Sequence, residues 1–283
     1  MPKTSGFLKL ESRYAITARL VPSSALHIGS GAISAKTDAP FFCDDTGPLI
    51  PGSGLRGALR SRLEKILQAI GGDRGCVLFT TDADCTHTKC FTVNSDLLKS
   101  FQKQHAMKPT LERERLLEEK LLEGDGLCDI CRLFGSPLMA SKLRISDARP
   151  KDSKVQVRDG VGIDRDTETA REHIKYDFEA LYSSGFELRV EIENATDWDL
   201  ALLAILFREM RDPGIELGGK KSRGLGRCKL EGELKVQGFS GSKELGRFLG
   251  TGKLEDVPGF QSRLSKCLER YLGVSTDAKT GTK

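Results

Sequence analysis

Residues 186–193 read FELRVEIE, so that apolar and charged side chains alternate along the whole stretch. Successive side chains of a β-strand point to opposite faces, and this period of two therefore predicts a half-buried strand. Asp197 follows as a candidate helix cap, and apolar residues then recur at three- and four-residue intervals through Met210, before Pro213 and Gly214 end the pattern. The stretch thus predicts a strand followed directly by an amphipathic helix.

The same two periods recur on both sides of this pair. Alternation predicts strands within residues 8–21, 142–146 and 228–236, and a short hairpin is expected between residues 41–42 and 49–50. A second amphipathic helix opens at Ser53 and ends at Gly71. Without the stretches between them, the order is strand, helix, strand, strand, helix, strand. We therefore expect an α+β fold with a ferredoxin-like (RRM-like) palm, in which an antiparallel sheet carries helices on one face.

Composition and charge narrow the class of protein. The chain has 283 residues, of which 38% are hydrophobic and 30% are charged. No run approaches the roughly 20 apolar residues that a membrane span needs, and the N-terminus has no apolar leader segment. We expect a cytoplasmic protein with no membrane partner. The net charge of +4 permits a nucleic-acid partner without requiring one.

Two stretches interrupt the regular pattern, and one follows it. Residues 73–140 contain five of the eight cysteines and a charged helical segment at residues 111–123, which predicts an insertion built around a local anchor. Residues 150–180 are polar with little apolar periodicity, which predicts a second excursion from the core. We therefore expect one domain over residues 1–236 with both insertions. A helical extension over residues 237–283 would carry one amphipathic helix at 257–271 and a disordered tail from 276.

The cysteines of the first insertion have the spacing of metal ligands. Cys128 and Cys131 form a Cys-x-x-Cys pair, and Cys85, His87 and Cys90 supply three further candidates within six residues. Zinc in structural sites is held by four such ligands, and it would fasten an insertion too small to form its own core. We expect a structural Zn²⁺ at Cys85, Cys90, Cys128 and Cys131, with His87 as the substitute for Cys85. Unligated thiols and a redox pair are the alternatives, and we expect buried packing roles for Cys43, Cys228 and Cys267.

The glycine-rich segment 218–226, which reads GGKKSRGLG, is a second candidate site. Glycines let a backbone approach a phosphate group closely, and Lys220, Lys221 and Arg223 add positive charge. A flexible, solvated connection is the alternative interpretation. His27 lies at a strand end beside another glycine loop and could contact RNA or a phosphate, although a surface histidine without a ligand is at least as common. Asp38, taken alone, is typical of a turn.

Seven segments together resemble the RAMP superfamily, and specifically the repeated backbone subunit of type III CRISPR effector complexes. The helix opening at residues 51–57 and the glycine-rich loop resemble the superfamily in general. The Asp-Ala-Pro sequence at residues 38–40 and the Ile-Asp-Arg sequence at residues 163–165 resemble the backbone subunit more narrowly. In chain order, the resembling segments are residues 26–30, 37–40, 49–57, 131–136, 143–148, 162–165 and 218–226.

The resemblance implies a palm whose surface holds a guide RNA and a thumb hairpin at residues 150–180 that wedges into the guide–target duplex. It implies zinc in the first insertion and places the loop of Asp38 at the exposed linkage of the target. Asp38 is then the catalytic residue of an endoribonuclease that acts within a complex, with a divalent ion, Mg²⁺ or Mn²⁺, as its cofactor. The residues expected to contact RNA are His27, Ser30, Arg56, Arg60, Ile163, Arg165, Lys220, Lys221 and Arg223.

The resemblance also implies a set of partners. These are a CRISPR guide RNA, a complementary target RNA, sibling RAMP subunits, and the large and small subunits of the effector complex. Three alternatives stay open from the sequence. The chain could be a non-catalytic RNA-binding assembly subunit of the same complex, or a guide-precursor-processing ribonuclease of the same superfamily. From outside the superfamily, the cysteines would suit a zinc-stabilised protein-interaction module.

Overall fold

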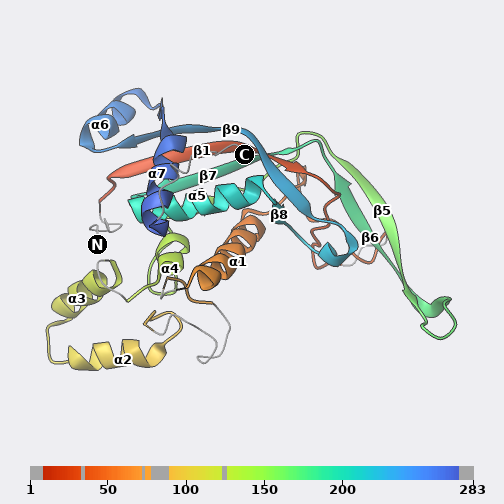
Figure 1. The fold of residues 1–283 in the computed structure, drawn as a ribbon, viewed down its shortest axis with the longest axis horizontal. Helices are drawn as coiled ribbons and strands as arrows, with labels where there is room; N and C mark the ends of the chain where they lie inside the picture. Colours follow the sequence, from red (N-terminus) through yellow and green to blue (C-terminus); the bar gives the residue numbers. More distant parts are fainter. Residues whose placement is uncertain (1–8, 33–35, 72–73, 78–88, 123–125, 274–283) are drawn as a thin grey trace, which may run out of the picture.

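The computed structural model describes residues 9–32, 36–71, 74–77, 89–122 and 126–273. Its centre is an antiparallel sheet of β1 (Ser12–Pro22), β4 (Leu143–Ile145), β7 (Phe186–Glu193) and β9 (Arg227–Ser240), in the order β9-β1-β7-β4 (Figure 1). The short strands β8 (Ile215–Glu216) and β10 (Glu255–Asp256) both pair with β9. Of these four strands, the first and third along the chain, β1 and β7, lie side by side at the centre. This is the ferredoxin-like arrangement, so the predicted fold class is confirmed.

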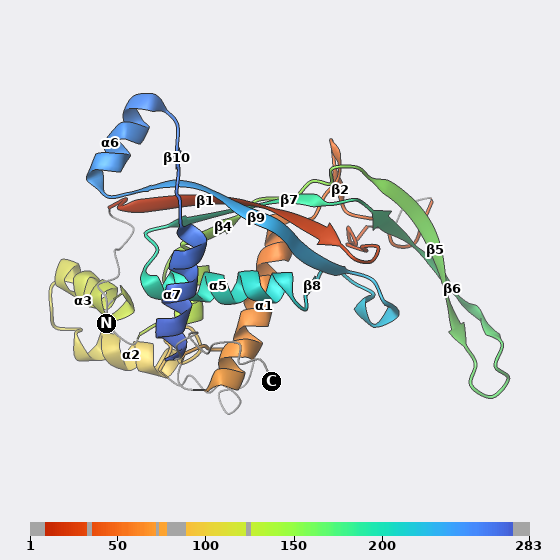
Figure 2. The same cartoon turned by 45° about the horizontal axis from the view of Figure 1, so that its top comes forward.

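Helices α1 (Gly52–Ile70), α5 (Asp197–Arg211) and α7 (Phe260–Leu272) lie on one face of the sheet (Figures 1 and 2). Both predicted palm helices are present, with their apolar stripes buried. The caps differ from the prediction. Thr196, not Asp197, caps α5 by accepting a hydrogen bond from the backbone N–H of Asp199, and α1 begins at Gly52 directly after Pro51.

The two faces of the sheet differ in chemistry. Alternate residues of β1 and β7 are buried against the helices, as the period of two predicts. The opposite face is crossed by ion pairs, such as Arg13–Glu193 at 2.7 Å and Arg144–Glu193 at 2.8 Å. An RRM stacks RNA bases on aromatic side chains of its open sheet. Here the outward residues of the two central strands are charged or small: Arg13, Ala15, Thr17, Arg19, Glu187, Arg189, Glu191 and Glu193.

The described part of the first insertion contains three helices. The charged segment predicted at residues 111–123 is α3 (Thr110–Leu122), whereas α2 (Ser95–Gln104) and α4 (Asp129–Phe134) were not expected. Helix α4 has only six residues, too few to be stable alone. It forms because it packs against α1 and α5, where Ile130, Leu133 and Phe134 are buried.

The second insertion is a long hairpin of β5 (Lys154–Ile163) and β6 (Ala170–Tyr182) that extends away from the palm (Figures 1 and 2). The hairpin expected at residues 150–180 is therefore present. Val155, Val157, Val161 and Ile163 alternate along one face of β5, and all four are exposed. A smaller hairpin, β2 (Cys43–Asp44) and β3 (Gly47–Pro48), lies within the one predicted at residues 41–50.

The C-terminal part of the chain packs on the palm. Strand β9 continues to Ser240, past the boundary expected at residue 236, and is followed by α6 (Ser242–Thr251), which was not expected. The helix expected at residues 257–271 is α7, and its apolar side chains join the main core against α5. The tail from residue 276 lies outside the described residues. None of the described helices is both long and apolar enough to cross a membrane.

Candidate RNA interface and metal centre

Asp38 lies on a loop that runs beside strand β6 of the hairpin. Its backbone N–H donates to Asp177 Oδ1 at 2.7 Å, and the backbone N–H of Asp177 donates to Asp38 Oδ2 at 3.0 Å. Two residues along β6, the N–H of Glu179 donates to the carbonyl of Ala39 at 3.0 Å. Asp38 itself is exposed. The loop is therefore held against the hairpin while Asp38 stays open to solvent.

The surroundings of Asp177 favour its charged form. The backbone N–H of Asp38 and the Thr37 side chain both hydrogen-bond to it, and Lys175 lies nearby, so the pKa of Asp177 is lowered from its ordinary value. Asp177 is thus a carboxylate at neutral pH. The edge of the hairpin beside Asp38 carries negative charge.

His27 is buried, so it is not the surface histidine that the sequence left open as an alternative. Its Nδ1 lies 2.8 Å from the carbonyl of Glu179, and its ring meets the Phe178 ring edge-on, with 5.2 Å between centroids. Its own carbonyl accepts a hydrogen bond from the N–H of Gly219 at 2.8 Å. His27 therefore joins the hairpin to the glycine-rich loop.

The glycine-rich loop turns sharply at positions that only glycine can occupy. Gly218 has φ +75°, and a Cβ there would lie 2.2 Å from the carbonyl oxygen of His27. At Gly226, with φ +92°, a Cβ would lie 2.3 Å from the carbonyl oxygen of Leu217. Between them the chain forms one turn of 3₁₀ helix at Lys221–Arg223. The glycines thus let the loop pack closely on the palm and present its cations outward.

Two cations of the loop lie on the aromatic side chains of the hairpin. Lys220 Nζ is 4.2 Å from the centre of the Tyr176 ring and 4.9 Å from that of Phe178. The Arg223 guanidinium is 5.3 Å from the centre of the Tyr176 ring and donates a hydrogen bond to the Tyr176 hydroxyl. Gly160 makes room for this ring, because a Cβ there would lie 2.2 Å from it. We call the group His27, Asp38, Tyr176, Lys220 and Arg223 the palm–hairpin junction.

The other expected RNA contacts are distributed over three places. Lys221 is exposed next to the junction, and Ser30 is exposed on the loop that leads to Asp38. Ile163, with 65% of its surface exposed, and Arg165 lie at the far end of the hairpin, away from the junction. The structure therefore gathers His27, Lys220 and Arg223 around Tyr176 and Phe178, and it holds Asp38 beside Asp177 of the same strand. The two tip residues lie apart from them.

Arg56 and Arg60 point toward the first insertion instead of the junction. Arg56 donates to the carbonyl of Phe134, and Arg60 donates to the carbonyl of Gly135 at 3.1 Å and to Glu64 at 2.9 Å. Burial lowers the pKa of Arg56. Burial also lowers the pKa of Arg60, but the hydrogen bonds from Arg60 to Glu64 and Cys131 outweigh burial, and the pKa is raised. Both side chains therefore serve the fold around the C-terminus of α4.

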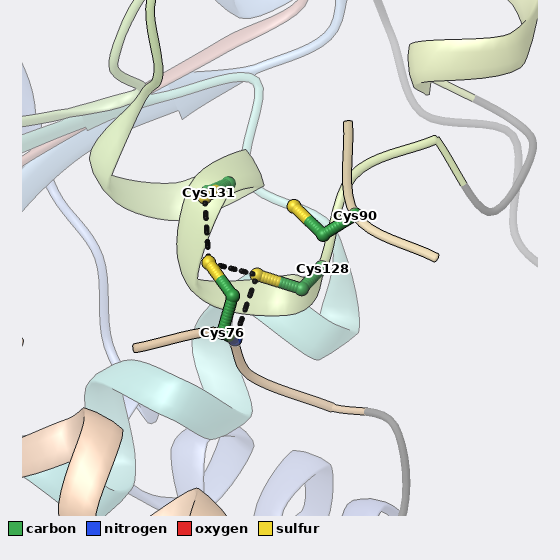
Figure 3. Close-up of side chains that lie close together, drawn as sticks. All are labelled: Cys76, Cys90, Cys128 and Cys131. Atoms are coloured by element: carbon green, nitrogen blue, oxygen red, sulfur yellow. Dashed lines mark hydrogen bonds between the residues drawn. The ribbon is translucent and has the colours of Figure 1, made fainter. Parts of the chain in front are cut away.

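Four buried cysteines converge beneath the palm. Cys76, Cys90, Cys128 and Cys131 place their sulfur atoms within 4.8 Å of one another (Figure 3). Cys128 precedes α4 and Cys131 lies in its first turn, which directs both thiols to one side. Cys76 follows the end of α1, and Cys90 precedes α2. One metal ion at this point would connect three segments of the chain.

The geometry of this cluster fits a tetrahedral metal. Four thiolates at about 2.3 Å from zinc would lie about 3.8 Å apart. Cys76 Sγ is 3.4 Å from Cys131 Sγ and 3.5 Å from Cys128 Sγ, whereas a disulfide needs about 2.05 Å. The sulfurs also receive hydrogen bonds, from the backbone N–H of Cys76 at 3.3 Å and from Arg60 at 3.6 Å. The residues present therefore suit a structural Zn²⁺.

The fourth sulfur is one that the sequence did not indicate. Cys90, Cys128 and Cys131 were expected ligands, and the structure adds Cys76 to them. Cys85 and His87 lie outside the described residues. Cys76 gave no such signal, because Cys85, His87 and Cys90 fall within six residues while Cys76 stands apart from them in the sequence.

The three remaining thiols outside the insertion are not alike. Cys228 and Cys267 are buried as expected, and burial raises the pKa of Cys228 to about 12. Cys43 is exposed on β2, so its expected packing role was wrong. Its pattern was misread because the hairpin there is only two residues per strand and carries no buried face.

A known protein family matches more than half of the chain. The family model of the RAMP superfamily matches residues 20–229, a range that includes the palm–hairpin junction and the four cysteines. Among solved structures, the chain is similar to one from a cryo-EM structure of type III-B Cmr-beta in the apo state, with 13% identity and a TM-score of 0.46. That match covers 77% of this chain and 96% of the other. No curated protein matches the sequence.

Proposed function

This chain belongs to the RAMP superfamily, and from that premise we propose that it is a guide-RNA-binding backbone subunit of a type III CRISPR effector complex that also cleaves complementary target RNA. The palm–hairpin junction carries the proposal. It combines cations held over aromatic rings of β6 with one exposed aspartate on the loop that is hydrogen-bonded to the same strand. The sibling RAMP subunits and the large and small subunits of such a complex are the proposed protein partners.

The cations of the glycine-rich loop are the proposed contacts to the guide backbone. Lys220, Lys221 and Arg223 are close together in space, and neutralising phosphates releases counterions, so binding should weaken as salt rises. Ile163 and Arg165, at the far end of the hairpin, are the proposed wedge that displaces a base of the guide–target duplex.

Asp38 is the proposed catalytic residue. In the proposed reaction, a ribose 2′-oxygen of the target attacks the adjacent phosphorus and the bond to the 5′-oxygen breaks. The products are a cyclic phosphate and a 5′-hydroxyl, which takes up the proton that the 2′-hydroxyl loses. Asp38 orients or deprotonates the 2′-hydroxyl, while the wedge holds oxygen and phosphorus in line.

A divalent ion, Mg²⁺ or Mn²⁺, is the proposed cofactor of cleavage. Such ions prefer carboxylate oxygens and keep several waters, and Asp38 offers an exposed carboxylate of this kind. When bound, the ion would supply positive charge at the phosphate during cleavage. The four cysteines belong to a second, structural role: a Zn²⁺ that fastens the first insertion to the palm.

The test begins with the complex purified through a tag on this chain. We expect a short discrete RNA and larger sibling proteins to copurify, and we expect added complementary RNA to be cut at regular intervals in Mg²⁺ or Mn²⁺. Asp38→Ala should reduce the cleavage rate by about 100-fold or more and leave the bound RNA unchanged. A matched control is Asp45→Ala, which removes an exposed aspartate from the neighbouring β2–β3 turn.

Each alternative predicts a different result from the same preparation. If RNA copurifies but target cleavage is absent or survives Asp38→Ala, then Asp38 is not catalytic and the chain fits a non-catalytic assembly subunit. Cleavage of a repeat-containing RNA by the isolated chain, without target, would favour a processing ribonuclease. Protein free of RNA would favour the zinc-stabilised interaction module.

A further inference from the structure

We infer that Asp177 is a positioning residue for Asp38: its carboxylate fixes the loop that bears Asp38 to strand β6, so that the carboxylate and the hairpin move as one body. This inference rests on the proposed cleavage function and adds to it a residue that neither the sequence pattern nor the resemblance indicated.

The two aspartates form a closed, reciprocal pair. Each side chain accepts a hydrogen bond from the backbone N–H of the other, at 2.7 Å to Asp177 Oδ1 and 3.0 Å to Asp38 Oδ2. A single bond would let the loop rotate about it, but two bonds between the same residues fix both backbone and side chain. The bond to Asp38 Oδ2 also fixes the direction of the carboxylate proposed to act on RNA.

Further contacts continue the attachment along β6. The N–H of Glu179 donates to the Ala39 carbonyl at 3.0 Å, and Glu179 Oε2 accepts from the N–H of Phe41 at 2.8 Å. These bonds hold the loop beyond Asp38. The Asp177 carboxylate is distinct because it binds the backbone of Asp38 itself.

This attachment connects the two parts of the proposed mechanism. The hairpin is the proposed wedge, and β6 is one of its two strands. Because Asp38 is bonded to β6, a shift of the hairpin on the duplex would carry the carboxylate with it. An error of about 1 Å in the position of a reacting group can reduce a rate by about 100-fold. The pair therefore aligns the carboxylate with the linkage that the wedge exposes.

A second explanation for Asp177 is that its negative charge, rather than its hydrogen bond, contributes to the site, for example by holding the divalent ion. Asp177→Asn separates the two, because the amide oxygen can still accept from the N–H of Asp38 while the charge is gone. Asp177→Ala removes both. Asp159→Ala is the matched control, since Asp159 faces Asp177 across the hairpin and pairs with Lys175 at 3.4 Å.

The first measurement is single-turnover cleavage by the purified complex with saturating complementary RNA. We expect Asp177→Ala to lower the rate constant by about tenfold without changing target affinity, and Asp177→Asn and Asp159→Ala to stay within about twofold of the original. Wild-type rates in Asp177→Ala, with Asp38→Ala inactive, would overturn the inference and leave the proposed function intact. An Asp177→Asn variant as slow as Asp177→Ala would show that charge is what matters, and would also overturn it.

A second measurement does not depend on cleavage. Amide hydrogen exchange of the isolated chain reports whether the N–H of Asp38 is protected by a hydrogen bond. We expect this amide to exchange about tenfold faster in Asp177→Ala than in the original chain, Asp177→Asn or Asp159→Ala. Unchanged exchange in Asp177→Ala would overturn the inference even if no complex cleaves RNA, a result that would separately count against the proposed function.

Discussion

The cysteine cluster and the palm–hairpin junction are built in opposite ways. The four sulfurs are buried and surrounded by protein, and their hydrogen bonds come from the chain itself. The junction is open, because Asp38 and Arg223 are exposed on loops that are fixed by contacts to the hairpin. A closed site with four ligands leaves no position for a substrate, whereas an open one can meet a long polymer. The comparison therefore suits the cluster to a stabilising role and supports the proposal that the junction contacts RNA.

The two regions also depend on the rest of the chain differently. The cluster is connected to the C-terminal helix, because the Tyr271 hydroxyl donates to Asp129 at 2.9 Å within the Cys-x-x-Cys turn, and Arg74 donates to the Tyr271 carbonyl at 2.9 Å. The junction depends on the hairpin, through Tyr176 and Asp177. Damage to the cluster should therefore reduce the stability of the palm, and damage to the junction should leave the fold intact.

The largest effect should come from the cluster. Cys76→Ser should reduce bound zinc well below one ion per chain and lower the free energy of unfolding by on the order of 4–5 kcal/mol, because loss of a metal is among the most destabilising changes a single mutation causes. Metal analysis measures the bound zinc, and thermal unfolding measures the loss of stability. Cys85→Ser is the matched control and should keep its zinc. Zinc retained in Cys76→Ser but lost in Cys85→Ser would assign the fourth ligand to Cys85.

An intermediate effect should come from the cations of the glycine-rich loop. The double variant Lys220→Ala, Lys221→Ala should weaken guide-RNA binding by about tenfold near physiological salt, and the dependence of binding on salt should become less steep by about one to two ions. Its unfolding temperature should stay close to the original. Lys99→Ala and Lys103→Ala on α2 remove the same charge far from the junction and should not change binding. An equal loss in that control would attribute the effect to net charge alone.

The smallest effect should come from acid at the junction. The pKa of Asp177 in the folded chain is lowered, chiefly by the N–H of Asp38 and the Thr37 side chain. The stability that this contact contributes is therefore fully present above the ordinary pKa of aspartate, about 3.9, and is lost as pH falls through the lower folded value. The amide resonance of Asp38 should shift only in that acidic range, and part of the shift should vanish in Asp177→Asn. A shift already complete at pH 5 would contradict the lowered pKa.

Local patterns predicted much of the palm. The alternation at residues 186–193 and the helical stripe from Leu55 to Leu67 were confirmed, because one face of each element is buried and selects apolar residues at a fixed period. Helix α4 was missed because packing, not its six residues, stabilises it. The local pattern alone did not indicate strand β5, because its alternating valines are exposed and the stretch is otherwise polar; the hairpin there was expected from the resemblance.

The two candidate sites show the same difference between local pattern and packing. The order of residues specifies which functional groups are available: thiols spaced as metal ligands, cations among glycines, and an aspartate before Ala-Pro. Which of these groups meet depends on the packing of the folded chain. Cys76 joins the cluster, Arg56 and Arg60 turn toward α4, and Asp177 reaches Asp38, because contacts between residues distant in the chain depend on how the sheet, insertion and hairpin pack. Spacing along the chain records neighbours in sequence, while ligation and hydrogen bonding require neighbours in space.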